Sequence, residues 1–187
     1  MATTNYTYRS YSMEYGTFLG LSWGLLFLCY VESISYNNGL LMMLCLLFVG
    51  TSLLLPFMLA LRLNRKFLVI GERLSYTQGL FFSFSMFMYA CLLTGLATFA
   101  YFQFFDDGTL FEQLNSMFTM PELVAVYQQM GMEEQYKQML DVLKDIEGMS
   151  AFDKALGLFN NNFIFGIAMS FIVGWVASFD LKKVIKK

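Results

Sequence analysis

The sequence contains no histidine, and only 14% of its 187 residues are charged. The absence of histidine removes the side chain that most often serves as a general base and as a transition-metal ligand. Its three cysteines, Cys29, Cys45 and Cys91, all lie in apolar stretches, where a free thiol behaves as a small hydrophobic group. They do not form the pattern of a disulfide framework or a zinc site. We therefore expect a protein that is not an enzyme and that holds no cofactor or metal.

Charge is also missing from four long stretches of the chain. No Asp, Glu, Lys or Arg occurs in residues 15–31, 33–61, 74–105 and 155–179. A helix needs roughly 17 to 25 mostly apolar residues to cross a hydrocarbon core about 30 Å thick, and each stretch has a suitable length. Because 57% of the residues are hydrophobic, the sequence predicts an all-α integral membrane protein built as a four-helix bundle.

The whole chain, residues 1–187, is expected to form a single membrane domain. We expect the spans at about 15–35, 38–61, 75–105 and 155–179. A small helical extracytoplasmic segment is expected at residues 106–154. Ser33 and Ser35 stand where a signal peptidase site could lie, but the segment before the apolar run is long and nearly neutral. The first span is therefore expected to be retained.

The charged residues between these stretches predict the orientation of the chain. Nine of the twelve basic residues lie near the ends of the chain or between the second and third spans: Arg9, Arg62, Arg65, Lys66, Arg73, Lys182, Lys183, Lys186 and Lys187. Segment 106–154 instead carries ten acidic residues and three lysines. Cytoplasmic loops of membrane proteins carry an excess of Lys and Arg. We therefore expect a cell inner-membrane protein with both termini in the cytoplasm and segment 106–154 in the periplasm.

Small residues recur at every fourth position in two of the spans. The first ridge consists of Gly16, Gly20 and Gly24 in the first span, and the second of Gly166, Ser170 and Gly174 in the fourth. Such ridges allow another helix backbone to approach closely. We expect the two ridges to face each other or another subunit, with intramolecular packing favoured over a dimer interface.

Two further features of the spans bear on function. No charged residue lies at mid-depth, whereas proton relays and ion-coupled carriers nearly always keep one. Asn160, Asn161 and Asn162 form a dense polar cluster at membrane depth, which either lines a polar cavity or makes hydrogen bonds between helices. In addition, Pro56 predicts a kink in the second span, because proline leaves the carbonyl four residues earlier without its donor.

The acidic segment between the third and fourth spans carries the signals of two helices. Thr119 followed by Pro121 predicts a helix start, and Gly131 a helix end. A second amphipathic helix is expected to end at Gly148. The apolar stripes of the two helices need cover, from each other, from the outer leaflet or from a partner, and the acidity of the segment favours a protein contact over anionic lipid.

With these features placed, the chain resembles the four-span inner-membrane proteins of the domain of unknown function 4199 family, which is common in Bacteroidota. The resemblance rests on the four spans, the basic stretch 62–73, residues 75–79 (SYTQG) and residues 128–132 (QQMGM) before Glu133 and Glu134. The resemblance implies the same topology, and it implies no activity because none is assigned to the family. Members of the family are often encoded near a glycosyltransferase that uses a lipid carrier, which implies such an enzyme as a partner.

Three functions are compatible with the sequence. The first is a non-catalytic accessory or scaffold protein, with Arg62, Arg65, Lys66 and Arg73 facing a cytoplasmic partner or lipid headgroups. The second is a small-solute carrier or channel acting as an oligomer, with a path lined by Ser83, Ser85, Thr94, Thr98 or the asparagine cluster. An intramembrane enzyme has the least support. The expected partners are the lipid bilayer and a protein partner or a second copy, and no nucleic acid.

Overall fold

The computed structural model describes residues 2–70 and 73–179, which form seven helices and no strand. The helices are α1 (Ala2–Ser35), α2 (Gly39–Ile70), α3 (Tyr76–Phe104), α4 (Thr109–Phe118), α5 (Pro121–Gln129), α6 (Glu133–Gly148) and α7 (Ala151–Ser178). Four of them are long and apolar enough to cross a membrane, with candidate spans at Arg9–Ser35, Gly39–Val69, Tyr76–Phe104 and Ala151–Ser178. The predicted all-α membrane fold is therefore confirmed.

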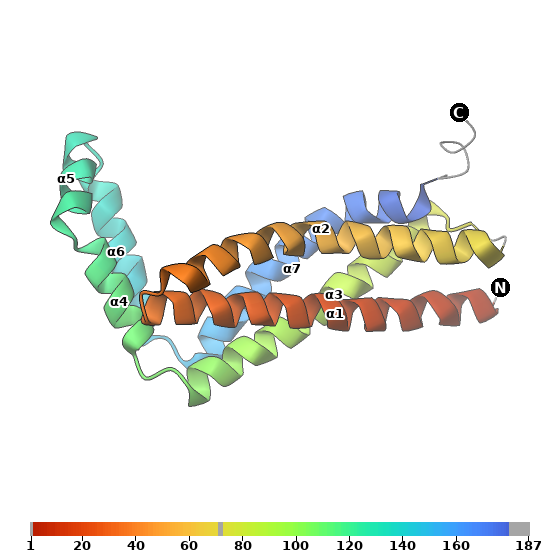
Figure 1. Ribbon diagram of the computed structural model, residues 1–187, viewed down its shortest axis with the longest axis horizontal. Helices are drawn as coiled ribbons and strands as arrows, with labels where there is room; N and C mark the ends of the chain where they lie inside the picture. The colour runs from red at the N-terminus through yellow and green to blue at the C-terminus, as the bar shows by residue number, and fades with distance from the viewer. Residues whose placement is uncertain (1, 71–72, 180–187) are drawn as a thin grey trace.

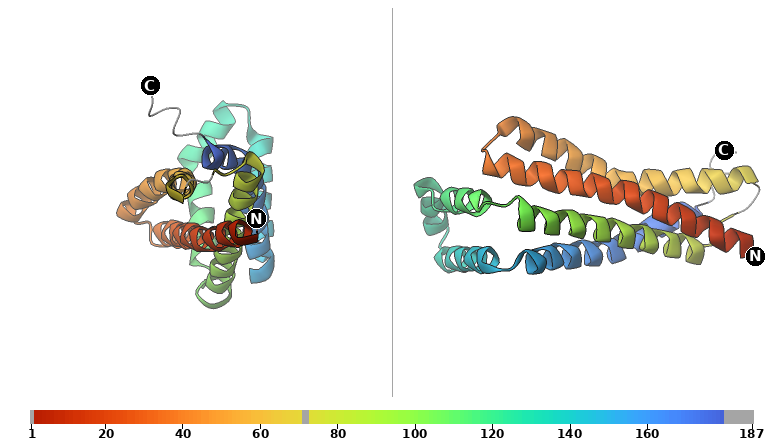
Figure 2. Two further views of the ribbon diagram at one scale, coloured as in Figure 1. Left: turned by 90° about the vertical axis from the view of Figure 1, so that its right-hand side faces the viewer. Right: turned by 90° about the horizontal axis from the view of Figure 1, so that it is seen from below.

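The four long helices form one bundle, and α3 is its central element (Figure 1). Helix α3 packs against α1 on one side and α7 on the other, while α2 packs mainly on α1 and less on α7. Figure 2 shows the pair α1 and α2 beside the pair α3 and α7, with the two pairs diverging toward the end that lies away from the termini. The main core draws on all four long helices, around the fully buried Leu19, Phe82, Met86 and Val173.

Helix α2 extends through the basic stretch, where the sequence had suggested a loop. Arg62, Arg65 and Lys66 all lie on its last turns. Leu63 and Phe67, next to these basic residues in the sequence, are buried in the main core, and this packing holds the chain in a helix beyond the uncharged stretch. The signal was present in the sequence, since apolar residues four positions apart lie on one helix face.

The first half of α2 packs loosely on the rest of the bundle. Between Gly39 and Leu55, only Cys45 and Ser52 are buried. Pro56 lies inside the helix, and Figure 2 shows α2 bending partway along its length. Because proline lacks the N–H that would bond to the carbonyl of Ser52, a bend at this place has a direct cause.

Helices α4, α5 and α6 form an arm that lies across one end of the bundle and projects to one side (Figure 1). The segment holds three helices where two had been predicted, and Thr119 ends α4 instead of capping α5. Leu110 and Phe111 of α4 are buried against Val31, Ile34 and Tyr101 at the ends of α1 and α3. This contact orders the first helix of the arm.

Candidate functional site

Both ridges of small residues pack on α3. A Cβ atom added at Gly16 would lie 2.6 Å from the carbonyl oxygen of Met86, and one added at Gly174 would lie 2.8 Å from the Cα of Leu80. Gly20 likewise meets Ala90, Gly24 lies beside Ala97, and Gly166 meets Phe87, all on α3, while Ser170 is buried and donates its hydroxyl to the Gly166 carbonyl. The ridges therefore do not face each other, because α3 lies between them and contacts both.

The basic residues cluster near the end of the bundle where the N-terminus lies. Arg62, Arg65 and Arg73 are exposed, and the ammonium nitrogen of Lys66 lies 4.1 Å from the centre of the Tyr11 ring. A cation over an aromatic ring is stabilised by the negative face of that ring. Lys66 is thus fixed to α1, whereas Arg62 and Arg65 extend from α2. The lysine tail at 182–187 and Glu72 and Asp180 lie outside the described residues.

Asn64, which did not stand out in the sequence, ties α2 to the end of α7. Its side-chain nitrogen donates to the carbonyl oxygens of Val176 at 3.3 Å and Phe179 at 2.7 Å, and its side chain is buried. The last carbonyls of a helix have no partner within the helix, so a side-chain donor there satisfies groups that burial would otherwise penalise. Because Asn64 lies between the charged residues Arg62 and Arg65, its place in the sequence offered no signal of this buried role.

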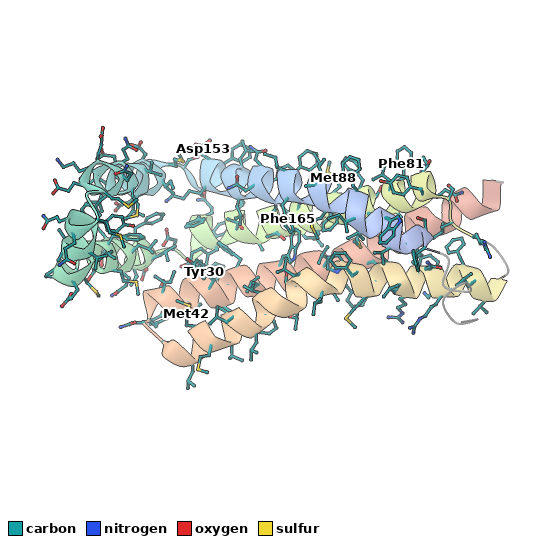
Figure 3. The ribbon with its side chains drawn as sticks, turned by 90° about the horizontal axis from the view of Figure 1, so that it is seen from above. Tyr30, Met42, Phe81, Met88, Asp153 and Phe165 are labelled. Carbon is teal, nitrogen blue, oxygen red and sulfur yellow. The ribbon has the colours of Figure 1, made fainter. Side chains whose placement is uncertain are left out.

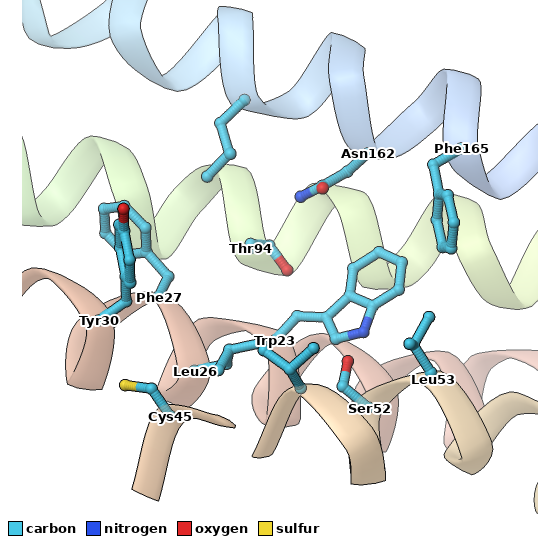
Figure 4. A pocket seen from close by; sticks show the side chains of 12 residues that line it. Trp23, Leu26, Phe27, Tyr30, Cys45, Ser52, Leu53, Thr94, Asn162 and Phe165 are labelled. Carbon is cyan, nitrogen blue, oxygen red and sulfur yellow. The ribbon is translucent and has the colours of Figure 1, made fainter. Parts of the chain in front are cut away.

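The asparagine cluster divides between two directions. Asn160 and Asn161 are exposed on the outward side of α7, whereas Asn162 is partly buried and its amide points into the bundle (Figure 4). Within residues 2–70 and 73–179, none of these three amides has a hydrogen-bond partner. Two amides therefore lie on the outer surface of the bundle, and one faces the interior.

Asn162 borders a pocket of about 370 Å³ that is lined by all four long helices. Figure 3 shows the pocket side of the bundle, with α7 and α2 at its two edges and α3 and α1 between them. The lining residues are Trp23, Leu26, Phe27, Tyr30, Cys45, Val49, Ser52, Leu53, Thr94, Leu158, Asn162 and Phe165. The pocket carries no charged side chain and is open at the side, where Tyr30 and Phe165 are 49% and 41% exposed. Its volume lies within the range of small-molecule sites, roughly 300 to 1,000 Å³.

The hydroxyls that had been considered as the lining of a solute path are bonded within their own helix. Ser83 donates to Gly79, Thr94 to Ala90 and Thr98 to Thr94, each to the carbonyl one turn earlier. All three side chains are buried at the contacts of α3. Of the residues named for that path, Ser85 is partly buried, and Thr94 and Asn162 reach the pocket.

The arm is held by aromatic contacts. The hydroxyl of Tyr136 donates to the carbonyl of Phe118 at 2.9 Å, and Lys154 lies 4.4 Å from the centre of the Phe111 ring.

At the start of α4, the Thr109 side chain and backbone N–H both donate to the Asp107 carboxylate. These hydrogen bonds lower the pKa of Asp107 below its ordinary value, because they stabilise the charged form.

Comparison with known proteins places the chain in a family. No curated protein and no solved structure matches it. In the part of the chain that the structure describes, no group of three or more metal-binding side chains comes together. The family model "Protein of unknown function (DUF4199)" matches residues 14–179, which include all four long helices and the arm. This match covers most of the chain and confirms the resemblance seen in the sequence. The chain is a multi-pass membrane protein and belongs to the DUF4199 family.

Proposed function

We propose that this chain is a non-catalytic accessory protein that holds a partner protein in the inner membrane. The observation that carries the proposal is the pair of amides, Asn160 and Asn161, exposed on the outward face of α7. Lipid tails offer no hydrogen-bond partner to an amide, so a polar group there is costly unless another helix satisfies it.

The same face of α7 allows a second helix to come close. Gly157 lies one turn before Asn161, and a Cβ added at Gly157 would meet nothing within 4 Å. The other glycines of α7, Gly166 and Gly174, are already in contact with α3. Small residues allow close helix approach in membranes, and interhelical hydrogen bonds there contribute about 0.6 to 2 kcal/mol each. The patch formed by Gly157, Asn160 and Asn161 therefore fits a membrane helix that carries a polar side chain.

The basic end of the bundle supports the same proposal. Arg62 and Arg65 are exposed on α2 and make no ion pair within the described residues. If both termini lie in the cytoplasm, this end faces acidic partners and anionic headgroups of the inner leaflet. A glycosyltransferase that uses a lipid carrier is the first partner to look for, since such an enzyme holds both a protein surface and a phosphate-bearing lipid.

The test is recovery of a partner from native membranes. The tagged chain is crosslinked in the membrane, solubilised in mild detergent and analysed by mass spectrometry. We expect one other membrane protein in fixed proportion, and we expect the double variant Asn160→Leu, Asn161→Leu to lose it. Asn115→Leu makes the same chemical change on an exposed position of the arm and serves as the control. Recovery of this chain alone, or a partner retained by the double variant, contradicts the proposal.

The orientation has its own test. A reporter that is active only in the cytoplasm is fused after Lys187, and a second copy is inserted at Gly131, in the turn after α5. We expect activity from the first fusion and none from the second. The reverse result would place the basic end outside the cell. The basic residues could then not contact the anionic headgroups of the inner leaflet.

A further inference from the structure

The pocket beside Asn162 contains polar groups that the fold leaves without partners. Trp23 and Ser52 are each 8% exposed, and neither the indole N–H nor the hydroxyl has a hydrogen-bond partner within residues 2–70 and 73–179. Figure 4 shows the Ser52 hydroxyl turned toward the indole nitrogen, with the Asn162 amide directed into the same space from α7. These two polar atoms are not sealed within the protein but line the pocket, so a ligand there can reach them. A polar group left unpaired in an apolar site costs about 1 to 3 kcal/mol, which favours a ligand with a hydrogen-bond acceptor.

We propose that the pocket binds an uncharged membrane lipid with a carbonyl-bearing ring, of the quinone class. Three groups from three helices line the pocket and can donate hydrogen bonds to a ligand: the Trp23 N–H from α1, the Ser52 hydroxyl from α2 and the Asn162 amide from α7. Indole N–H is a donor only, so a ligand that bonds to it supplies an acceptor. Phe165 and Phe27 provide flat apolar surface against which a ring can stack.

The depth of the pocket selects among carbonyl-bearing lipids. Trp23 lies midway between Glu14 and Glu32 on α1, nine residues from each, which is about 14 Å along a helix. The hydrocarbon core is about 30 Å thick, so Trp23 lies close to its middle. Ester carbonyls of phospholipids stay near the headgroups at the edge of that core. A carbonyl lipid without a charged head can reach the middle, and a quinone does so with its ring and its apolar tail.

The lining and the opening agree with this occupant. The pocket has no charged residue, which disfavours a phosphate-bearing head or an ion. The first half of α2 and the outward side of α7 are exposed beside the opening, so a ligand dissolved in lipid can enter sideways. The side chains of Val49 and Leu53 on α2 line the pocket wall next to that route.

The two tryptophans of the chain provide the assay. Trp23 lies in the pocket, while Trp175 is 56% exposed on α7. Quinones quench indole fluorescence, so Trp175→Phe leaves Trp23 as the reporter of the site, and Trp23→Phe leaves Trp175 as the reporter of the lipid. The full chain in phospholipid nanodiscs is titrated with decylubiquinone. We expect saturable quenching of Trp23 at one site per chain and a linear, unsaturated response from Trp175.

Variants then connect the binding to the polar groups. Made in the Trp175→Phe background, the pair Ser52→Ala and Asn162→Leu is expected to weaken the apparent affinity about tenfold or more, because the ring carbonyl loses two donors. Ser22→Ala is the control, since Ser22 precedes Trp23 but lines a different groove between α1 and α2. Circular dichroism of each variant shows whether the helices are retained.

Three results would overturn the assignment. Trp23 quenching that rises linearly with decylubiquinone shows a lipid-dissolved quencher without a site. An affinity unchanged by the paired substitution shows that the polar groups do not hold the ring. Relief of Trp23 quenching by an equal amount of dioleoylglycerol shows that the pocket takes acyl ester lipids as readily as quinones. If the paired variant loses its helices, Ser52→Ala alone replaces it, and unchanged binding there also overturns the proposal.

Discussion

The contact between α3 and α7 leaves no space for a side chain at Gly174, so Gly174→Ala should destabilise the bundle. The added Cβ would lie 2.8 Å from the Cα and 2.9 Å from the backbone nitrogen of Leu80, and 3.1 Å from the carbonyl carbon of Gly79. These are backbone atoms of a helix, which cannot turn away as a flexible side chain can. The substitution can therefore be accommodated only if α3 and α7 move apart.

The size of the effect follows from these distances. Non-bonded carbon atoms rest at about 3.5 to 4.0 Å, so the two helices must separate locally by about 1 Å. Overpacking of this kind costs about 1 to 3 kcal/mol. Replacing glycine by alanine within a helix recovers up to about 1 kcal/mol through helix propensity. Because the clash is with helix backbone, the cost lies toward the upper end of its range, and we expect a net loss of about 1 to 2 kcal/mol in the free energy of unfolding.

Equilibrium unfolding in mixed micelles with increasing SDS measures this loss. Gly157→Ala is the matched control on the same helix, because a Cβ there meets nothing within 4 Å, and it should leave the transition unchanged or raise it. A Gly174→Ala protein as stable as the parent would refute the packing described for α3 and α7. Equal destabilisation by both substitutions would show that the glycines act through the helix itself and not through this contact.

Two further predictions test the ends of the bundle. Asn64→Leu should lower the unfolding free energy by about 1 to 3 kcal/mol, because it leaves two carbonyls at the end of α7 unpaired. The same SDS titration measures this loss. Unchanged stability would mean that these carbonyls find other donors. The hydrogen bonds from Thr109 lower the pKa of Asp107, so they stabilise the fold above the ordinary aspartate pKa, and this contribution is lost as the pH falls through the lowered pKa. Thr109→Ala should therefore raise the pKa of Asp107, which an NMR titration of its carboxylate carbon measures, and an unshifted titration would contradict the assignment.

The membrane fold could be predicted because it depends on a simple property of the chain. A stretch without charged residues and of sufficient length can cross a bilayer whatever its neighbours are. The ends of the helices were harder to predict, since Arg62, Arg65 and Lys66 indicated a loop by their charge. The structure keeps them helical because the adjacent Leu63 and Phe67 pack in the core. The burial of apolar side chains on one face of α2 thus determined its helical conformation, although the other face carries charged residues.

The partners of the ridges and the pocket could not be predicted from the sequence. Repeated small residues show that a close contact exists, but they do not say which helix makes it, and here α3 serves both ridges. The pocket brings together Trp23, Ser52 and Asn162 from three helices. Only the asparagine stood out in the sequence, because a single Trp or Ser in an apolar span is common. Their convergence depends on the spacing of the helices, which no local pattern encodes.

The uneven packing of the bundle explains why a pocket exists at all. Helices α1, α3 and α7 meet through glycines and small residues, so their backbones lie close together and leave little space between them. Helix α2 has no such ridge facing α3, and its first half buries only Cys45 and Ser52. Because Pro56 allows this half to bend away from the bundle, Ser52 stays near Trp23 while the surrounding wall opens toward the lipid. The rigid part of the fold thus provides the floor of the pocket, and the loosely packed helix provides its entrance.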